Sequence, residues 1–216
     1  MYVNIKLMLD YVNYSLYKWE VIGDFKMIGI LMGMQPGFTK YNCFLCLWDS
    51  CKVTEHYKRK KWPLCENFNV GENNIKYDPL VDKNKVLMPP LHIKLGLCKQ
   101  FVKALDFQSE AFLFIKQMFP ELSEAKVKEG IFIGPQVRKL LHSEEFSNLL
   151  SGVQLAAWQS FKLVVENFLG NHKSDDFRDY ISQMLSNFEL MGCRMSLKVS
   201  IKIIFLNIIS GNRRHI

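Results

Sequence analysis

The spacing of apolar residues divides the chain into two parts of different character. Beyond Pro89 and Pro90, apolar side chains recur every three or four positions, which predicts successive α-helices separated by Gly, Pro and Ser. Ser123 and Ser174 are expected to act as N-caps, because a serine hydroxyl can accept a hydrogen bond from a free helix N–H. The helices are predicted over residues 91–107, 111–119, 123–130, 136–142, 144–150, 153–169 and 174–191.

The first 90 residues have a weaker periodicity. Apolar positions predict a helix over residues 2–14, and a β-branched and aromatic run predicts a short strand over residues 18–25. Residues 26–35 are apolar on almost every side, which is typical of a buried helix, and Pro36–Gly37 should end it. Residues 64–90 are polar and rich in turn formers, so a long loop is predicted. The expected fold class is therefore α+β, predominantly α-helical.

Asp24 lies between the predicted strand and the helix that follows it. A carboxylate at the end of a strand is a common position for a metal-binding catalytic acid. Aspartate is also a favoured helix N-cap, where its charge suits the helix dipole. The pattern alone favours the cap.

Cys43 and Cys46 are separated by two residues, a spacing that brings two sulfurs to one metal ion without distorting the backbone. A structural zinc site needs four ligands, and Cys51, His56 and Cys65 are the local candidates for the others, although their spacings match no standard zinc finger. Shared zinc ligation would hold the two sulfurs of the pair within about 4 Å of each other. Two alternatives stay open, namely buried thiols that behave as small apolar side chains and a redox-active pair.

A basic run follows the cysteines. Lys58, Arg59, Lys60 and Lys61 are followed by Trp62, and the whole chain carries a formal net charge of +7 with a pI near 9.0. An excess of positive charge favours polyanionic partners, so these four side chains are the candidate DNA-binding residues. The alternative is a solvated loop that keeps the protein in solution.

Composition restricts the protein class. With 216 residues, of which 49% are hydrophobic, the chain is long enough to form a sizeable core. Six cysteines without a recognisable signal peptide indicate reduced thiols rather than a disulfide framework. The most apolar stretch, residues 199–209, is too short for a membrane span and contains Lys202. We therefore expect an intracellular protein, with the nucleus as a candidate compartment, no membrane partner and no evident small-molecule substrate; the oligomeric state stays open.

Several strings in the sequence resemble a group of uncharacterised invertebrate proteins that look transposon-derived. They are Gly23-Asp-Phe-Lys26, Gly37-Phe-Thr-Lys40, Cys43-Phe-Leu-Cys-Leu-Trp-Asp-Ser50, Leu87-Met-Pro-Pro-Leu-His-Ile-Lys-Leu-Gly-Leu97 and Asn167-Phe-Leu-Gly-Asn-His-Lys173. Over residues 2–198 the chain resembles DDE transposases, which have a ribonuclease-H-like fold, and in particular the Transib-like group. The resemblance rests on Asp24, on the CxxC pair that begins 19 residues later, and on a long helical insertion.

The resemblance implies a role for each part of the chain. In DDE transposases three acidic residues bind two divalent metals, which activate water and then a DNA 3′-hydroxyl. Asp24 matches the second acid, and Cys43 and Cys46 match the first half of a zinc site whose other half is a downstream histidine pair. The implied organisation is a partial ribonuclease-H-like sheet edge in residues 1–42, a cysteine knuckle and basic loop in 43–90, a helical insertion in 91–198 and a divergent tail in 199–216.

The sequence also departs from the family pattern. The first acid belongs on a strand before residue 1, and the last acid and the histidine pair belong beyond Lys198, where His215 is the sole histidine. We therefore expect a truncated transposase-derived protein without autonomous cleavage or strand transfer, with Mg²⁺ needed in the parent family only. Its structural zinc site is expected to be incomplete, or completed weakly by His56, Cys51 or Cys65. The alternative is a non-enzymatic, zinc-stabilised module that binds nucleic acid or protein. The tail is expected to lack apolar partners, so that its deletion improves solubility.

Overall fold

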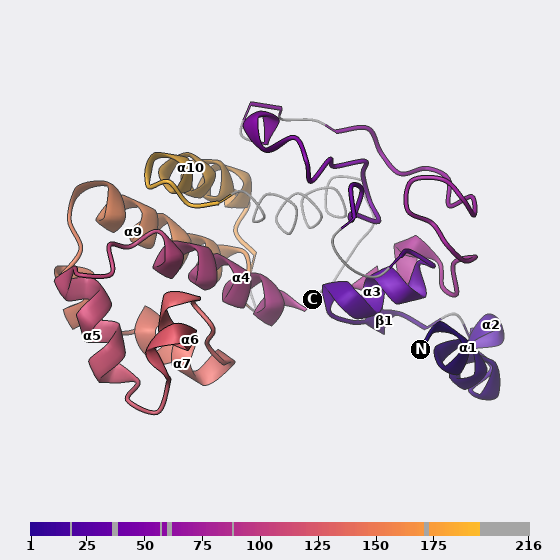
Figure 1. Ribbon diagram of the computed structural model, residues 1–216, viewed down its shortest axis with the longest axis horizontal. Helices are drawn as coiled ribbons and strands as arrows, with labels where there is room; N and C mark the ends of the chain where they lie inside the picture. The colour runs from indigo at the N-terminus through magenta and orange to yellow at the C-terminus, as the bar shows by residue number, and fades with distance from the viewer. Residues whose placement is uncertain are drawn as a thin grey trace. The chain divides into compact units, whose positions relative to one another are not determined.

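The computed structural model describes residues 1–17, 19–35, 39–56, 58–59, 62–87, 89–170 and 173–194 (Figure 1). Within this range the chain forms two compact units, which we call the N-terminal unit (residues 1–89) and the helical unit (residues 90–194). The structure is 53% helix and 5% strand, which confirms an α+β fold that is mainly helical. The tail from residue 199 and the Pro36–Gly37 helix stop lie outside the described residues.

The N-terminal unit combines short elements with long connections. Its elements are α1 (Tyr2–Tyr11), α2 (Tyr14–Tyr17), β1 (Val21–Ile22), α3 (Phe25–Leu31), the 3-10 helices η1 (Val53–Glu55) and η2 (Lys83–Lys85), and β2 (Val86–Leu87). Strands β1 and β2 pair in parallel, with Val21 opposite Val86 and Ile22 opposite Leu87. A parallel pair needs a crossover connection, and here α3 and the cysteine-bearing segment supply it. Strand β2 lies in the stretch that was expected to be an irregular loop.

Two helix boundaries in this unit differ from the prediction. The helix expected over residues 2–14 is divided after α1 by Asn13, which has a φ of 53°. Helix α3 ends at Leu31, before the predicted stop, and Gly33 follows in the left-handed region with a φ of +68°. A Cβ atom at Gly33 would lie 1.9 Å from the backbone oxygen of Tyr77, so this position requires glycine.

The helical unit contains seven helices in its described residues. They are α4 (Pro90–Lys103), α5 (Glu110–Met118), α6 (Glu124–Lys128), α7 (Gly134–Leu141), α8 (Glu144–Asn148), α9 (Gly152–Asn167) and α10 (Phe177–Leu190). The predicted cap at Ser123 is confirmed, because its hydroxyl accepts a hydrogen bond from the backbone N–H of Lys126. Ser174 instead accepts from the N–H of Asp176, which is the N-cap residue of α10.

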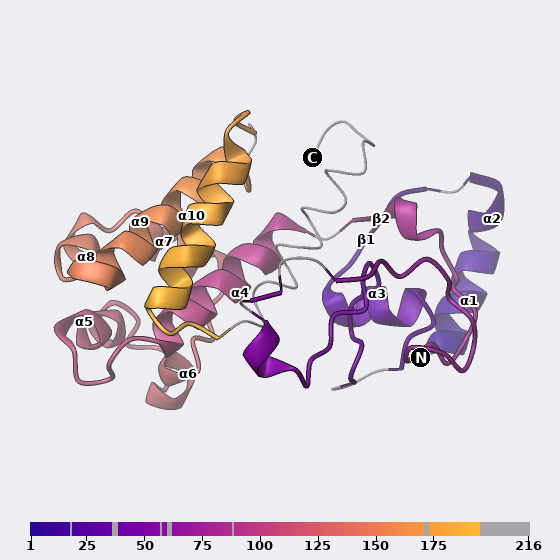
Figure 2. The same cartoon turned by 90° about the horizontal axis from the view of Figure 1, so that it is seen from above.

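The core of the helical unit is aromatic. Helices α9 and α10 pack side by side (Figure 2). Both contribute rings to the interior, and Phe188 of α10 lies 6.3 Å from Phe161 of α9 between ring centroids. The ring of Trp158 lies 4.8 Å from Phe101, 5.0 Å from Phe146 and 5.6 Å from Phe161, measured between centroids. All four rings are fully buried. Aromatic rings at these separations contribute stability beyond the area that they bury.

The first helix of the N-terminal unit buries none of its side chains. Helix α1 contains no buried residue, and Val3, Leu7 and Tyr11 are exposed to solvent. The interior of this unit is built instead from α3 and the segments that follow it, where Ile28 and Phe44 are buried. In the part of the chain that the structure describes, no helix is long and apolar enough to cross a membrane.

Candidate metal and nucleic-acid site

The two cysteines of the CxxC motif lie together. Their side chains are each 1% exposed, and their Sγ atoms are 3.5 Å apart. The backbone N–H of Leu45 points back at the sulfur of Cys43, with 3.4 Å between the nitrogen and Sγ. The expected separation of less than about 4 Å is therefore confirmed. We call residues 43–46 the cysteine knuckle.

A short antiparallel pairing fixes the shape of the cysteine knuckle. The N–H of Leu47 donates to the carbonyl of Pro63 at 2.8 Å, and the N–H of Cys65 donates to the carbonyl of Leu45 at 2.9 Å. The ring of Phe44, between the two cysteines, is buried. Because the backbone is held on one side and the ring is anchored on the other, the two sulfurs are pre-positioned.

Burial makes the Cys43 thiol a weak acid. Desolvation raises the pKa of the Cys43 thiol well above its ordinary value, and the neighbouring Cys46 raises it further. The backbone N–H groups of Leu45 and Cys46 act in the opposite direction, because they stabilise a thiolate. Metal ligation requires thiolates, so metal binding at this pair would release protons and would strengthen as pH rises.

The geometry of the pair fits two of the four ligands of a tetrahedral zinc site. Zn–S bonds of about 2.3 Å place two sulfurs roughly 3.8 Å apart, close to the separation that the knuckle already has. The other predicted ligands have different partners. Cys51 is exposed, the Sγ of Cys65 donates to the carbonyl of Asn67 at 3.6 Å, and the Nε2 of His56 lies 2.7 Å from the carbonyl oxygen of Asp49. Among the described residues no group of three His, Cys, Asp or Glu side chains is arranged to hold a metal.

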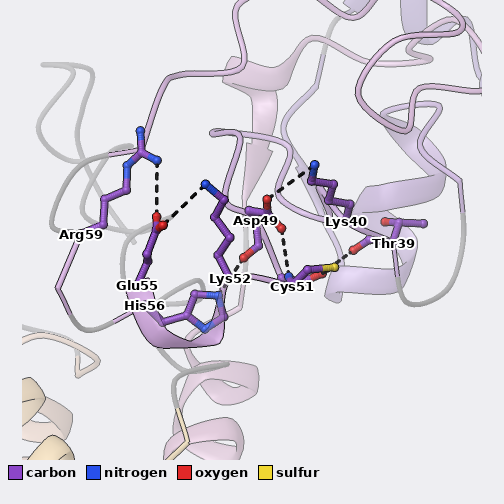
Figure 3. Close-up of polar contacts among 9 residues, drawn as sticks. Thr39, Lys40, Asp49, Cys51, Lys52, Glu55, His56 and Arg59 are labelled. Atoms are coloured by element: carbon purple, nitrogen blue, oxygen red, sulfur yellow. Dashed lines mark hydrogen bonds and ion pairs between the residues drawn. The ribbon is translucent and has the colours of Figure 1, made fainter.

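His56 and Asp49 organise the segment that follows the knuckle (Figure 3). The carbonyl oxygen of Asp49 can only accept, so His56 carries its proton on Nε2, and its ring stacks on Trp48 with centroids 4.3 Å apart. The Asp49 carboxylate is 4% exposed and accepts a hydrogen bond from the N–H of Cys51 at 3.0 Å. Lys40 lies 3.7 Å from the same carboxylate. In this geometry the side chains of His56 and Asp49 form hydrogen bonds with backbone groups of the loop.

Asp24 lies two residues after the end of β1 and is the N-cap residue of α3. Its Oδ1 accepts a hydrogen bond of 2.7 Å from the N–H of Met27, and its backbone is extended, as in an N-cap residue. The cap that the pattern favours is therefore present. The carboxylate also lies at the carboxyl end of a strand in a parallel pair, where ligands bind in open α/β sheets.

The basic run is only partly described. Lys58 and Arg59 are exposed, whereas Lys60 and Lys61 lie outside the described residues. The Arg59 guanidinium lies over the ring of Trp62, 4.5 Å from its centroid, and 3.8 Å from the carboxylate of Glu55. The cationic surface at this point therefore contains an acidic side chain as well as an aromatic one.

The positive charge of the chain is unevenly distributed. Residues 1–89 contain twelve Lys and Arg against nine Asp and Glu, whereas residues 90–194 contain twelve of each. The remaining excess comes from four basic residues after Arg194. The helical unit is therefore neutral, and within the sequence of residues 1–194 the cationic excess belongs to the segment 1–89, which holds the cysteine knuckle.

Sequence reasoning missed the contacts that Glu55 makes. Glu55 lies three residues after Lys52 and four before Arg59, which are the spacings at which side chains meet on one face of a helix. That signal was readable from the sequence. The contact between His56 and the Asp49 carbonyl depends on how the loop closes, and it had no comparable local signal.

Comparison with known families finds two matches. Residues 1–81 match a family described as "Domain of unknown function (DUF8703)", and residues 90–170 match one described as "Domain of unknown function (DUF8704)". No curated protein and no solved structure matches the chain. The two matched segments fall on either side of the division between the N-terminal and helical units.

Proposed function

We propose that this chain is a transposase-derived protein whose N-terminal unit holds zinc at the cysteine knuckle and binds DNA electrostatically, without autonomous cleavage or strand transfer. The observation that carries the proposal is the pair of buried sulfurs, 3.5 Å apart, in a unit with an excess of positive charge. The Cys46 thiol donates a hydrogen bond to the Cys43 sulfur, and the same alignment suits two ligands of one metal ion.

Asp24 supports the ribonuclease-H-like part of the proposal. It follows a strand of a parallel pair, the place where such sheets bind ligands, and it would be the remnant second acid of a DDE triad. A single carboxylate cannot hold two metal ions at the separation of about 3.5–4 Å that two-metal DNA chemistry needs. Mg²⁺ is accordingly assigned to the parent family and not to this chain.

Zinc at the knuckle would act as a cross-link within the loop. Cys43 and Cys46 would hold it, and Cys65, Cys51 and His56 are the local side chains that could complete its coordination. Cys65 is the best placed of the three, because its backbone pairs with Leu45 next to the knuckle. Burial raises the pKa of its thiol, Lys83 acts in the opposite direction, and Cys46 raises that pKa further. Bound zinc would supply stability to a segment that contains little regular structure.

DNA binding is assigned to the basic run. Lys58, Arg59, Lys60 and Lys61 would contact phosphates, which position a protein on DNA without reading its sequence. The nearby Trp62 holds the Arg59 guanidinium by a cation–π contact, which limits the freedom of that side chain.

A second function is favoured by one specific observation. The Asp24 carboxylate is engaged with the N–H of Met27 as a helix cap, which is a complete structural role for this side chain. A non-enzymatic, zinc-stabilised module that binds nucleic acid or protein would need no other role for it. The coding sequence beside this chain separates the two, since acid-bearing segments in frame before Met1 and after Lys198 would support the transposase derivation.

A nicking and binding assay tests the proposed function. We expect purified protein to bind a DNA duplex with an affinity that falls steeply as salt rises, and to leave a supercoiled plasmid uncut in Mg²⁺ or Mn²⁺. Metal-dependent nicking that disappears in Asp24→Asn would contradict the non-catalytic assignment. Absence of DNA binding at low salt would contradict the assignment of DNA as the binding partner.

A further inference from the structure

The carboxylate of Glu55 lies between two cations (Figure 3). Its Oε1 is 3.6 Å from the Nζ of Lys52, and its Oε2 is 3.8 Å from a terminal nitrogen of Arg59. Each oxygen thus faces a different positive charge. A small anionic group with two terminal oxygens is the chemistry that this pair of cations accommodates.

Local backbone structure sets this arrangement. Glu55 is the last residue of η1, and its backbone carbonyl accepts a hydrogen bond of 2.8 Å from the N–H of Arg59. Lys52 precedes η1, so both cations project from positions adjacent to one turn. The Arg59 side chain is further oriented by the Trp62 ring beneath it. The two positive charges are therefore pre-positioned around one point.

The contacts at that point are loose and open to solvent. The side chains of Lys52, Glu55 and Arg59 are 50%, 42% and 42% exposed. Distances of 3.6 and 3.8 Å exceed the roughly 2.7–2.9 Å of a charge-assisted hydrogen bond. Exposed pairs of this kind contribute little to stability, so a competing anion can displace the carboxylate.

The neighbouring Asp49 shows what a structural carboxylate looks like in the same loop. It is buried and accepts a hydrogen bond from the backbone N–H of Cys51, and it also lies near Lys40. Glu55 has no comparable backbone donor to its carboxylate among the contacts of the described residues. Of the two carboxylates, that of Glu55 is therefore the one that another anion can displace.

We propose that Lys52 and Arg59 form a phosphate-binding site for the DNA backbone, which Glu55 occupies as an internal competitor until DNA displaces it. The proposal rests on the DNA binding proposed above and adds Lys52 and Glu55 to the residues involved. A phosphodiester has one negative charge and two terminal oxygens, so it matches the carboxylate that it replaces. Arginine is well suited to such a group because its planar fork can donate two hydrogen bonds.

The variant Glu55→Gln removes the competing charge and keeps the shape of the side chain. We expect it to bind a DNA duplex about three- to ten-fold more tightly than wild type at low salt. Because the site would carry one more net positive charge beside the phosphate, the slope of log affinity against log salt should steepen by about one. Adding Lys52→Gln to Glu55→Gln should remove most of the gain.

Glu66→Gln is the matched control. Glu66 is an exposed acid in the same unit, so the variant makes the same change in net charge without altering the surroundings of Lys52 and Arg59. We expect its affinity to change less than about two-fold, because salt screens the effect of an exposed charge that, among the ion pairs of the described residues, pairs with neither Lys52 nor Arg59. Circular dichroism and thermal melting of each variant would establish that the fold is kept.

Fluorescence anisotropy with a short labelled duplex, over a range of salt concentrations, gives the result. A tighter and more salt-dependent Glu55→Gln, with Glu66→Gln close to wild type, supports the site. If wild type binds DNA and the two variants behave alike, the competitor role is overturned while the proposed DNA binding stands. If neither wild type nor Glu55→Gln binds at low salt, both proposals are overturned.

Discussion

The two units of this protein are stabilised in different ways. The helical unit buries a connected set of aromatic rings around Trp158, and its acidic and basic residues are equal in number. The N-terminal unit begins with a helix that buries none of its side chains, and its interior includes the polar residues Asp49 and His56. One unit is stabilised by packing between helices, whereas the other combines an apolar interior around α3 with hydrogen bonds in its long connections.

This difference suggests that the helical unit mainly supplies stability, whereas the features suited to binding lie in the N-terminal unit. A neutral helical unit with an apolar core has the properties of a scaffold. The N-terminal unit has the excess positive charge, the two adjacent thiols and the exchangeable Glu55 contacts, which are features that a ligand can use. Loops in general carry binding residues because their side chains are accessible and their backbones can adopt irregular shapes.

The largest expected effect is in the helical core. Replacing Trp158 with alanine removes a fully buried ring that contacts three others, so the free energy of unfolding should fall by about 3–5 kcal/mol. Chemical denaturation measures this loss. Leu113→Ala, at a position in the same unit that is 43% exposed, should cost less than about 1 kcal/mol. Equal costs for the two variants would contradict the aromatic core as the source of stability.

The next effect is on DNA binding. Neutralising Lys58, Arg59, Lys60 and Lys61 to glutamine should flatten the slope of log affinity against log salt by about three to four. Anisotropy titrations over a range of salt concentrations measure the slope. The control neutralises four cations of the helical unit, namely Lys99, Lys126, Lys139 and Lys162. A slope that changes equally in both variants would place the DNA contacts across the whole chain and would remove the contrast between the units.

A smaller effect is expected at the α3 cap. Asp24→Ala leaves the N–H of Met27 without its side-chain acceptor and should lower the free energy of unfolding by about 1 kcal/mol. Asp24→Asn should cost much less, because asparagine caps helices about as well as aspartate. Hydrogen exchange at the first amides of α3 would locate the change. If asparagine is as damaging as alanine, the negative charge has a role beyond the cap.

The smallest effect is a pH dependence in the helical unit. Lys128 and Lys116 lower the pKa of the Glu124 carboxyl to about 2 through hydrogen bonds and charge. A folded pKa below the ordinary value of 4.5 means that the contribution of Glu124 to stability is present above pH 4.5. It is then lost as pH falls toward about 2. Glu124 is exposed, so salt screens this contribution.

The comparison with Glu124→Gln measures this dependence. The difference in melting temperature between wild type and the variant should be larger at pH 6 than at pH 2. A difference that stays constant between these two pH values would show that the lysine contacts of Glu124 do not persist in solution.

The helices beyond Pro90 could be predicted from the sequence because their signals are local. The helix expected over residues 111–119 is α5, Glu110–Met118, and Ser109 caps it as a serine at that position should. The N-terminal unit was less predictable. The end of α3 depends on the approach of the Tyr77 backbone to Gly33, and a two-residue strand such as β2 has no periodicity to detect.

The same distinction applies to the candidate site. The spacing of Cys43 and Cys46 predicted the separation of their sulfurs, because a CxxC turn is a local structure. The positions of Cys51, His56 and Cys65 depend on how the loop folds around Asp49 and on its pairing with residues 45–47. Those contacts join residues that are far apart in the sequence or that lie in segments without regular secondary structure, so no local sequence pattern predicts them.

Metal titration of the cysteine knuckle tests the central claim most directly. Cobalt(II), added to reduced protein in place of zinc, gives an absorption band from charge transfer when thiolates bind it. We predict a band that saturates at one metal per chain in wild type and in Cys51→Ser, that weakens as pH falls, and that is lost in Cys43→Ser. A wild-type protein without the band, or a Cys43→Ser variant that retains it in full, would contradict the account and leave Cys43 and Cys46 as buried thiols.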